Sequence, residues 1–264
     1  MKNKKTLNII LIVISGIIFV SATAALIMRV VPKKNKYLKY KNNSSSSQTS
    51  QTVEKPDNPV DFAALTAKNP DVCGWISIDG TTINYPILQS GDDTEENFYL
   101  THDLERKYKF AGSVYIQRCN NNEFLDRNTV IYGHDLADGT MFTPLRKYRN
   151  AEFFKTNDTI KIYKKGHILT YKIFSAFVYD DRHIINSFDF SSDEGYQAFL
   201  DECLHPKSLA KNVREDIPVT VKNKIITLST CTDVASERYL VCAVLTDDTE
   251  TKENERIKEI CGLL

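Results

Sequence analysis

Three residues of this 264-residue chain carry the side chains that acyl transfer through a thiol requires. Cys231 ends the apolar run Ile225 to Cys231, and a strand there would carry its sulfur out of the core beside hydroxyl groups. The short connection Asp233 to Glu237 leads to Arg238, which opens a second apolar run. So short a link predicts a hairpin in which Arg238 faces Cys231, where a guanidinium can stabilise a thiolate or a developing oxyanion.

A histidine far upstream completes the set. His134 directly follows the run Thr129 to Tyr132 and Gly133, and this run predicts another strand. A Cys–His pair needs proximity in space rather than in sequence, and the imidazole pKa of about 6.5 suits acid–base chemistry near neutrality. A buried Cys or a lone His is more often structural, so it is the combination that indicates a cysteine enzyme.

Short strands dominate the region that must position these residues. Many short strands with few helices predict an antiparallel barrel or sandwich. Two helices are expected, one after Asp61 and one over Ser191 to Leu204 with Ser192 as its cap. The charged stretch Asp247 to Lys258 is assigned to no element. The expected strands are Cys73 to Ile78, Thr82 to Ile87, Gly112 to Ile116, Thr129 to Tyr132, Thr159 to Tyr163, Ile168 to Tyr179, Val219 to Val221, Ile225 to Cys231 and Tyr239 to Thr246.

The amino terminus predicts a membrane segment. Leu7 to Met28 carries no charge and is long enough to span a hydrocarbon core of roughly 30 Å. A short basic start before it favours a signal-anchor with the amino end inside, over residues 1–31. A cleaved signal peptide is the alternative, because Ala22-Thr23-Ala24 resembles a cleavage site. Residues 32–59 are polar and serine-rich, which predicts a flexible extracellular stalk before a catalytic domain over 60–264.

The composition of the chain argues against some classes of partner and cofactor. Thirty-four basic and 34 acidic side chains give no net charge, which argues against a broad nucleic-acid surface. The six cysteines form no C-x-x-C pair, and a domain of this size does not need disulfides. No cofactor or metal is expected. The acidic cluster Asp92, Asp93, Glu95 and Glu96 lacks an EF-hand pattern, and His102, His167, His183 and His205 lack metal-like spacing.

The motifs resemble those of the sortase family, and of its class B in particular. Thr227-Leu228-Ser229-Thr230-Cys231 is similar to the TLxTC motif, and Arg238 to the family's essential arginine. Tyr132-Gly133-His134, followed by Thr140-Met141-Phe142, resembles the block around the essential histidine. The likeness extends over roughly Asp61 to Thr246, and the helix Ser191 to Leu204 resembles the extra helix of class B.

This resemblance implies an eight-stranded β-barrel with a few peripheral helices and a cysteine transpeptidase on the surface of a Gram-positive cell. Cys231 would be the nucleophile, His134 the acid–base catalyst and Arg238 the residue that holds the substrate carbonyl and oxyanion. Ser229 and Thr230 would contact the substrate backbone. The implied partners are sorting-signal peptides at the carboxyl ends of secreted proteins, cleaved after Thr, and an amine of peptidoglycan or its precursor.

Two other classes of function remain open from the residues alone. A hydrolytic cysteine peptidase would use the same pair of side chains, whereas an L,D-transpeptidase usually has a His next to its nucleophile, where this chain has Ser229-Thr230. An exported β-module that only binds a partner is the non-enzymatic alternative. Alkylation of Cys231 separates the binding module from the enzymes, because a binding module should keep its activity when Cys231 is blocked.

Overall fold

The computed structural model describes residues 36–40 and 55–254. The predicted membrane segment Leu7 to Met28 and most of the predicted stalk lie outside these residues. In the part that is described, no helix combines the length and the apolar character needed to cross a bilayer. One piece of the predicted stalk, the 3-10 helix η1 over Lys36–Tyr40, packs on the domain, because Tyr37 is buried edge-on to Tyr85.

The domain is mainly β, with short helices at its periphery. Its strands are β1 (Val72–Ile78), β2 (Asn84–Gln89), β3 (Val114–Ile116), β4 (Asn128–Tyr132), β5 (Thr159–Lys164), β6 (His167–Asp180), β7 (Lys211–Val213), β8 (Ile225–Cys231) and β9 (Glu237–Glu250). Its helices are α2 (Phe62–Lys68), η2 (Phe98–Leu100), η3 (Thr143–Arg149), α3 (Ala151–Thr156), α4 (Ile184–Ser187) and α5 (Asp193–Leu204).

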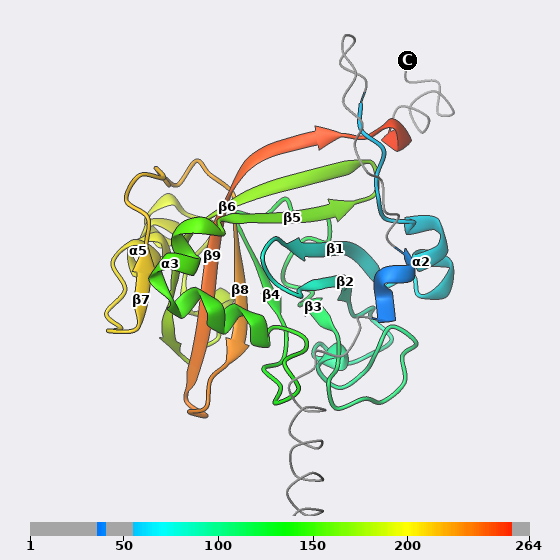
Figure 1. The fold of residues 1–264 in the computed structure, drawn as a ribbon, viewed down its shortest axis with the longest axis horizontal. Helices are drawn as coiled ribbons and strands as arrows, with labels where there is room; N and C mark the ends of the chain where they lie inside the picture. The colour runs from blue at the N-terminus through cyan, green and yellow to red at the C-terminus, as the bar shows by residue number, and fades with distance from the viewer. Residues whose placement is uncertain (1–35, 41–54, 255–264) are drawn as a thin grey trace, which may run out of the picture. The chain divides into compact units, whose positions relative to one another are not determined.

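The described strands close into an eight-stranded barrel. Their order is β5-β1-β2-β3-β4-β8-β9-β6, and β5 also pairs with β6, which completes the ring (Figure 1). β7 pairs with the part of β6 that extends beyond β5, and it lies outside the ring. Closure leaves no unpaired edge within the ring, so the barrel is a rigid support for side chains at its strand ends.

Two of the pairings are parallel, and one of them positions the site. β4 runs parallel to β8 from Asn128↔Ile225 to Tyr132↔Ser229. Parallel neighbours end at the same edge of a sheet, so the residues that follow β4 and the last residue of β8 are brought together. The next neighbour, β9, is antiparallel to β8 and begins at that same edge.

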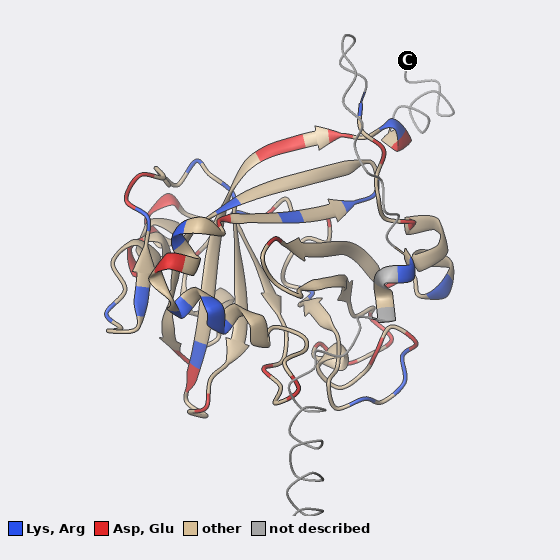
Figure 2. Ribbon diagram, in the orientation of Figure 1, with Lys and Arg blue, Asp and Glu red and all other residues tan. Residues whose placement is uncertain are grey.

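Apolar packing occurs on both faces of the strands. The barrel interior is filled by buried residues of β1, β2, β4, β5 and β6, with Trp75 fully buried. On the outer face, α5 packs Tyr196, Phe199 and Leu200 against β6 and β9. Ser192 caps α5 by accepting a hydrogen bond from the Gly195 amide, as its sequence predicts. Figure 2 shows basic and acidic residues interspersed along the ribbon of the described elements, in keeping with the zero net charge.

Two expected elements differ in the structure. Val219 to Val221 is not a strand, and the short strand beside β6 is instead β7, formed by Lys211–Val213. β9 is longer than Tyr239 to Thr246 because its end pairs with β6 as far as His167↔Glu250. That end is charged and exposed, so it has none of the apolar alternation by which a strand is usually found.

Candidate active site

Cys231 lies at the point where β8 leaves the core. The preceding residues of β8 are all buried, whereas Cys231 is exposed and is a free thiol. A buried strand that ends in an exposed Cys presents the sulfur to solvent on an immobile backbone. This is the arrangement expected of a nucleophile and not of a core cysteine.

Arg238 stands directly opposite Cys231. The two residues are partners in the register of the β8–β9 hairpin, as the short link between them predicts. The Arg238 guanidinium donates from Nη1 to the carbonyls of Ala235, at 3.0 Å, and Glu237, at 2.8 Å. Only Nη1 takes part in its hydrogen bonds within the described residues, so Nε and Nη2 can donate to a bound peptide.

His134 is fixed to β8 through the backbone of Gly133. The Gly133 amide donates to the Ser229 carbonyl at 3.2 Å, and the Thr230 hydroxyl donates to the Gly133 carbonyl at 2.7 Å. A side chain at Gly133 would not fit, because its Cβ would lie 2.7 Å from the Phe142 ring. The residue before His134 is therefore held against β8 on one side and Phe142 on the other.

The imidazole of His134 is oriented by the segment between β2 and β3. Nε2 lies 2.8 Å from the Leu100 carbonyl, and the ring stacks on Phe110 with centroids 5.8 Å apart. A carbonyl only accepts, so Nε2 carries a hydrogen and Nδ1 is the nitrogen that gains or loses a proton.

One groove of about 340 Å³ contains all three predicted catalytic residues. Cys231, His134 and Arg238 line it together with Ser229 and Thr230, which were predicted from the same motif. Burial is the main cause that raises the pKa of the Tyr115 phenol in the groove wall, and the nearby Cys231 adds to it. The remaining lining residues are Asn97, Leu100, Tyr115, Gln117, Tyr132, Gly133, Tyr179, Asp181, Arg182, His183 and Ile184.

Ser229 and Thr230 differ in what they contribute to the groove. Both side chains are almost fully buried. The Thr230 hydroxyl is engaged with Gly133 and so joins the end of β8 to the residue before His134. Ser229 joins the same two segments through its carbonyl, which accepts from the Gly133 amide.

Sequence reasoning missed several residues around the site. Leu100 and Phe110 contact His134 from a long connection whose conformation has no local sequence signal. Arg146 of η3 is ion-paired with Asp135 and Asp233, the neighbours of His134 and Cys231. The positions of the two aspartates, one and two residues from the predicted catalytic pair, were the only available signal.

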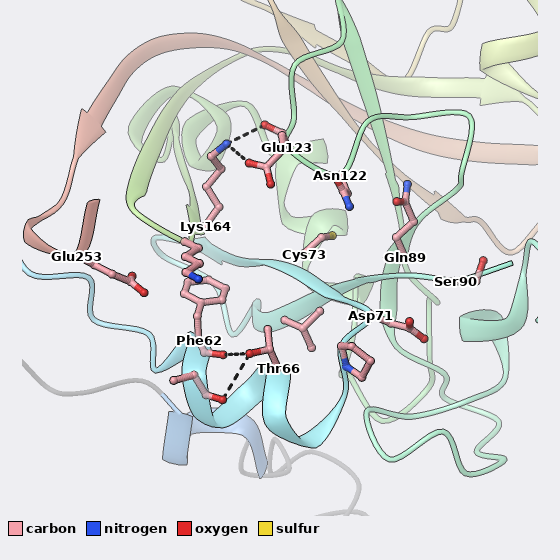
Figure 3. Close-up of a pocket in the computed structure, with 15 residues that line it drawn as sticks. Phe62, Thr66, Asp71, Cys73, Gln89, Ser90, Asn122, Glu123, Lys164 and Glu253 are labelled. Atoms are coloured by element: carbon pink, nitrogen blue, oxygen red, sulfur yellow. Dashed lines mark hydrogen bonds and ion pairs between the residues drawn. The ribbon is translucent and has the colours of Figure 1, made fainter. Parts of the chain in front are cut away.

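A second cavity, of about 600 Å³, lies between α2, the β1–β2 pair and the β5–β6 turn (Figure 3). It also contains a cysteine, Cys73, whose pKa is raised well above its usual value by burial. The Cys73 sulfur lies 3.5 Å from the Ile87 carbonyl. Lys164 in the same cavity is paired with Glu123 at 2.5 Å, and the cavity's lining includes neither a His nor an Arg.

Three other histidines have polar partners of their own. His102 contacts the Phe98 carbonyl at 2.8 Å, and His167 pairs with Asp248 at 2.6 Å. His183 lies in the groove wall, where Nε2 lies 2.7 Å from the Gln117 side-chain oxygen. Among the residues that the structure describes, no group of three His, Cys, Asp or Glu side chains could hold a metal ion.

Comparison with known proteins gives one consistent result. The model of the Sortase domain family matches residues 76–246. Sortase B of Staphylococcus aureus is 37% identical over 176 residues, which is 67% of this chain and 69% of that protein. Sortase B of Listeria monocytogenes is 37% identical over 170 residues, or 63% of this chain and 65% of that protein.

Solved structures agree with this match. The X-ray structure of Clostridium perfringens sortase B superposes with a TM-score of 0.64 at 31% identity, covering 71% of this chain and 100% of that one. The Staphylococcus aureus sortase B–substrate complex superposes with a TM-score of 0.62 at 35% identity, covering 70% of this chain and 84% of that one.

Proposed function

This chain belongs to the sortase family and is a sortase transpeptidase, and from that premise we propose that Cys231, His134 and Arg238 carry its chemistry. The observation that supports this assignment best is that one groove contains all three side chains, with Cys231 and Arg238 paired across a hairpin. The proposed reaction cleaves a sorting signal near the carboxyl end of a secreted protein after its Thr and joins the protein to an amine of peptidoglycan or its precursor.

In the first half-reaction the Cys231 thiolate attacks the carbonyl carbon of the substrate Thr, and a carbon–sulfur bond forms. The carbonyl oxygen becomes an oxyanion, which the free Nε and Nη2 donors of Arg238 can stabilise. The peptide carbon–nitrogen bond then breaks, and the leaving amine takes a proton from Nδ1 of the His134 imidazolium. A thioacyl-enzyme and a short carboxyl-terminal peptide result.

In the second half-reaction the acceptor amine attacks the thioester carbonyl. Its nitrogen gives a proton to Nδ1 of His134, a carbon–nitrogen bond forms, and the carbon–sulfur bond breaks to restore the Cys231 thiolate. Proton transfer balances over the two halves, so the enzyme returns to its starting state. A bound peptide that covers Leu100, Tyr115 and Ile184 in the groove wall would shield the thioester from water and so favour amine attack.

The roles of Ser229 and Thr230 follow from their place in the groove. Both lie beside Cys231 on β8, and we propose that they contact the substrate backbone there. The Thr230 hydroxyl has a second task, since it holds Gly133 and thereby keeps His134 near the nucleophile.

The proposed location is the outer face of the cell membrane. It is supported by the uncharged run Leu7 to Met28, which would anchor the chain with its amino end inside and the catalytic domain outside. The membrane and the cell wall would then be its surroundings. The stalk over 32–59 would let the domain reach its two substrates.

Mass spectrometry of the protein with a library of candidate sorting pentapeptides tests the assignment. We expect a thioacyl adduct on Cys231 that is discharged to a peptide product when an amine is added. Cys231→Ala should form no adduct under the same conditions. A wild-type protein that forms no adduct with any peptide would overturn the assignment, and discharge to water alone, unaffected by amines, would identify a hydrolytic peptidase.

A further inference from the structure

Arg146 joins the loop that carries His134 to the loop that follows Cys231. It lies in η3 and reaches Asp135 at 2.6 Å from Nε and 2.5 Å from Nη2. Its Nη2 also lies 2.8 Å from Asp233. Asp135 is the residue after His134, and Asp233 lies two residues after Cys231, so one guanidinium connects the neighbours of both predicted catalytic residues.

The arm of Arg146 that reaches Asp135 is the buried one. The Asp135 side chain is only 5% exposed, and both contacts go to a single carboxylate oxygen. The same loop is tied down by its backbone, since the Phe142 amide donates to the His134 carbonyl at 2.9 Å. The position of Arg146 is therefore set by the loop that carries His134.

The arm that reaches Asp233 is exposed and restrains a looser segment. The Asp233 side chain is 76% exposed, in the β8–β9 loop. This loop supplies the Ala235 carbonyl, and the first residue of β9 supplies the Glu237 carbonyl, and both hold the Arg238 guanidinium. A shift of the loop would thus move Arg238 relative to Cys231.

We propose that Arg146 is a positioning residue, which binds the Asp233 loop to the His134 loop so that Cys231, His134 and Arg238 keep one geometry. It does not line the groove and contacts no reacting atom. The inference rests on the proposed function, because it concerns the same three residues. A displacement of about 1 Å in a catalytic group can lower a rate by up to about a hundredfold, so a weak restraint at this place can have a large effect on activity.

The expected signature is a loss of activity without a loss of stability. An exposed ion pair contributes about 0–1 kcal/mol to folding, so Asp233→Asn should leave the melting temperature nearly unchanged. We expect kcat for thioacylation to fall about tenfold or more, and Asp233→Glu to restore most of it. Because an exposed ion pair is screened by salt, 1 M NaCl should also lower the wild-type kcat toward that of Asp233→Asn.

The chain offers a matched control in a second arginine bridge. Arg106 pairs with Asp71, which is 11% exposed, at 3.1 Å, and with Asp93, which is 67% exposed, at 2.6 Å. The two bridges have the same composition and similar exposure, but neither Arg106 nor Asp93 lines the catalytic groove. Asp93→Asn should therefore leave kcat and its salt dependence as in the wild type.

The experiment measures kcat and KM for a sorting peptide, at low and high salt, in wild type, Asp233→Asn, Asp233→Glu and Asp93→Asn, with melting temperatures in parallel. A loss of kcat that occurs in Asp233→Asn but not in Asp93→Asn, and that is largely restored in Asp233→Glu, supports the proposal. Equal kcat in wild type and Asp233→Asn, or an equal loss in Asp93→Asn, overturns it. Failure of the proposed function itself would appear separately, as a wild type that forms no thioacyl adduct.

Discussion

The groove with Cys231 and the second cavity each contain a cysteine, but the two thiols lie in different surroundings. The second cavity is the larger, at about 600 Å³ against about 340 Å³. Cys73 lies on a strand within it, and burial raises its pKa, which keeps the thiol neutral and poorly nucleophilic. Cys231 lies at a strand end, exposed, with Arg238 opposite and His134 in the same groove. Cavity size is thus a poorer guide to function here than the groups around the sulfur.

The largest expected difference in activity comes from replacing each cysteine with alanine. Cys231→Ala should lower transpeptidation by a factor on the order of 10⁴ or more, because the covalent step is lost. Cys73→Ala should keep full activity and lower the free energy of unfolding by about 1 kcal/mol, since a small, partly buried side chain is shortened. Rates of peptide joining and urea denaturation measure the two effects. An active Cys231→Ala protein would contradict the proposal that Cys231, unlike Cys73, is the nucleophile.

The next effect concerns His134, one of two histidines that line the groove and have no counterpart in the second cavity. His134→Ala should lower kcat by about 10²- to 10⁴-fold, the usual contribution of general acid–base catalysis. The matched control is His167→Ala, which removes an imidazole paired with Asp248 outside the groove. Steady-state kinetics over a range of pH make the comparison, and similar losses in the two variants would argue against a catalytic role for His134.

Substitution of Arg238 tests whether activity needs only a positive charge at this place in the groove. Arg238→Lys keeps the charge but loses the planar set of donors, and we expect kcat to fall by about 10²- to 10³-fold, as when one oxyanion donor is removed. The reverse exchange in the second cavity, Lys164→Arg, keeps a cation beside Glu123 and should leave kcat unchanged. A fully active Arg238→Lys enzyme would mean that the donor geometry of the guanidinium is not used.

The smallest effect is a pH dependence of stability that arises from Cys73. Burial raises the pKa of the folded thiol, whereas an unfolded cysteine ionises near pH 8.5. The stability that Cys73 contributes is therefore complete below about pH 8.5 and is lost as the pH rises beyond it.

Urea denaturation at pH 7.5 and 9.5 measures this dependence. Wild type should lose about 1.4 kcal/mol more than Cys73→Ala over that interval. Cys203, whose pKa burial also raises, is unchanged in both proteins and cancels from the difference. Equal losses in the two proteins would mean that the Cys73 thiol ionises in the folded state.

Sequence patterns predicted the elements whose apolar residues face a core. β8 has the bounds expected for Ile225 to Cys231, and α5 begins after its predicted cap, Ser192. The charged end of β9 was missed because it is held by pairing with β6 rather than by burial. Val219 to Val221 has apolar side chains but no strand partner among the described residues.

The site was predictable to the extent that its residues are joined locally. Cys231 and Arg238 flank a short link, so their pairing follows from hairpin geometry. His134 could be placed beside them only by resemblance to a family, because the β4–β8 pairing has no local signal. The contacts of Arg146 could not be predicted for the same reason, because ion pairs between distant loops have no characteristic spacing in the sequence.

The pairing of β4 with β8 also determines when activity can appear as the chain folds. The Thr227 hydroxyl donates to the Asn128 side-chain oxygen across 99 positions of sequence, and the Thr230 hydroxyl donates to the Gly133 backbone carbonyl across 97. Contacts of such separation form late, because the entropy of closing a long loop is lost before they compensate for it. His134 and Cys231 come together only when these long-range contacts form. We therefore expect competence to appear with the pairing of β4 and β8 and not before it.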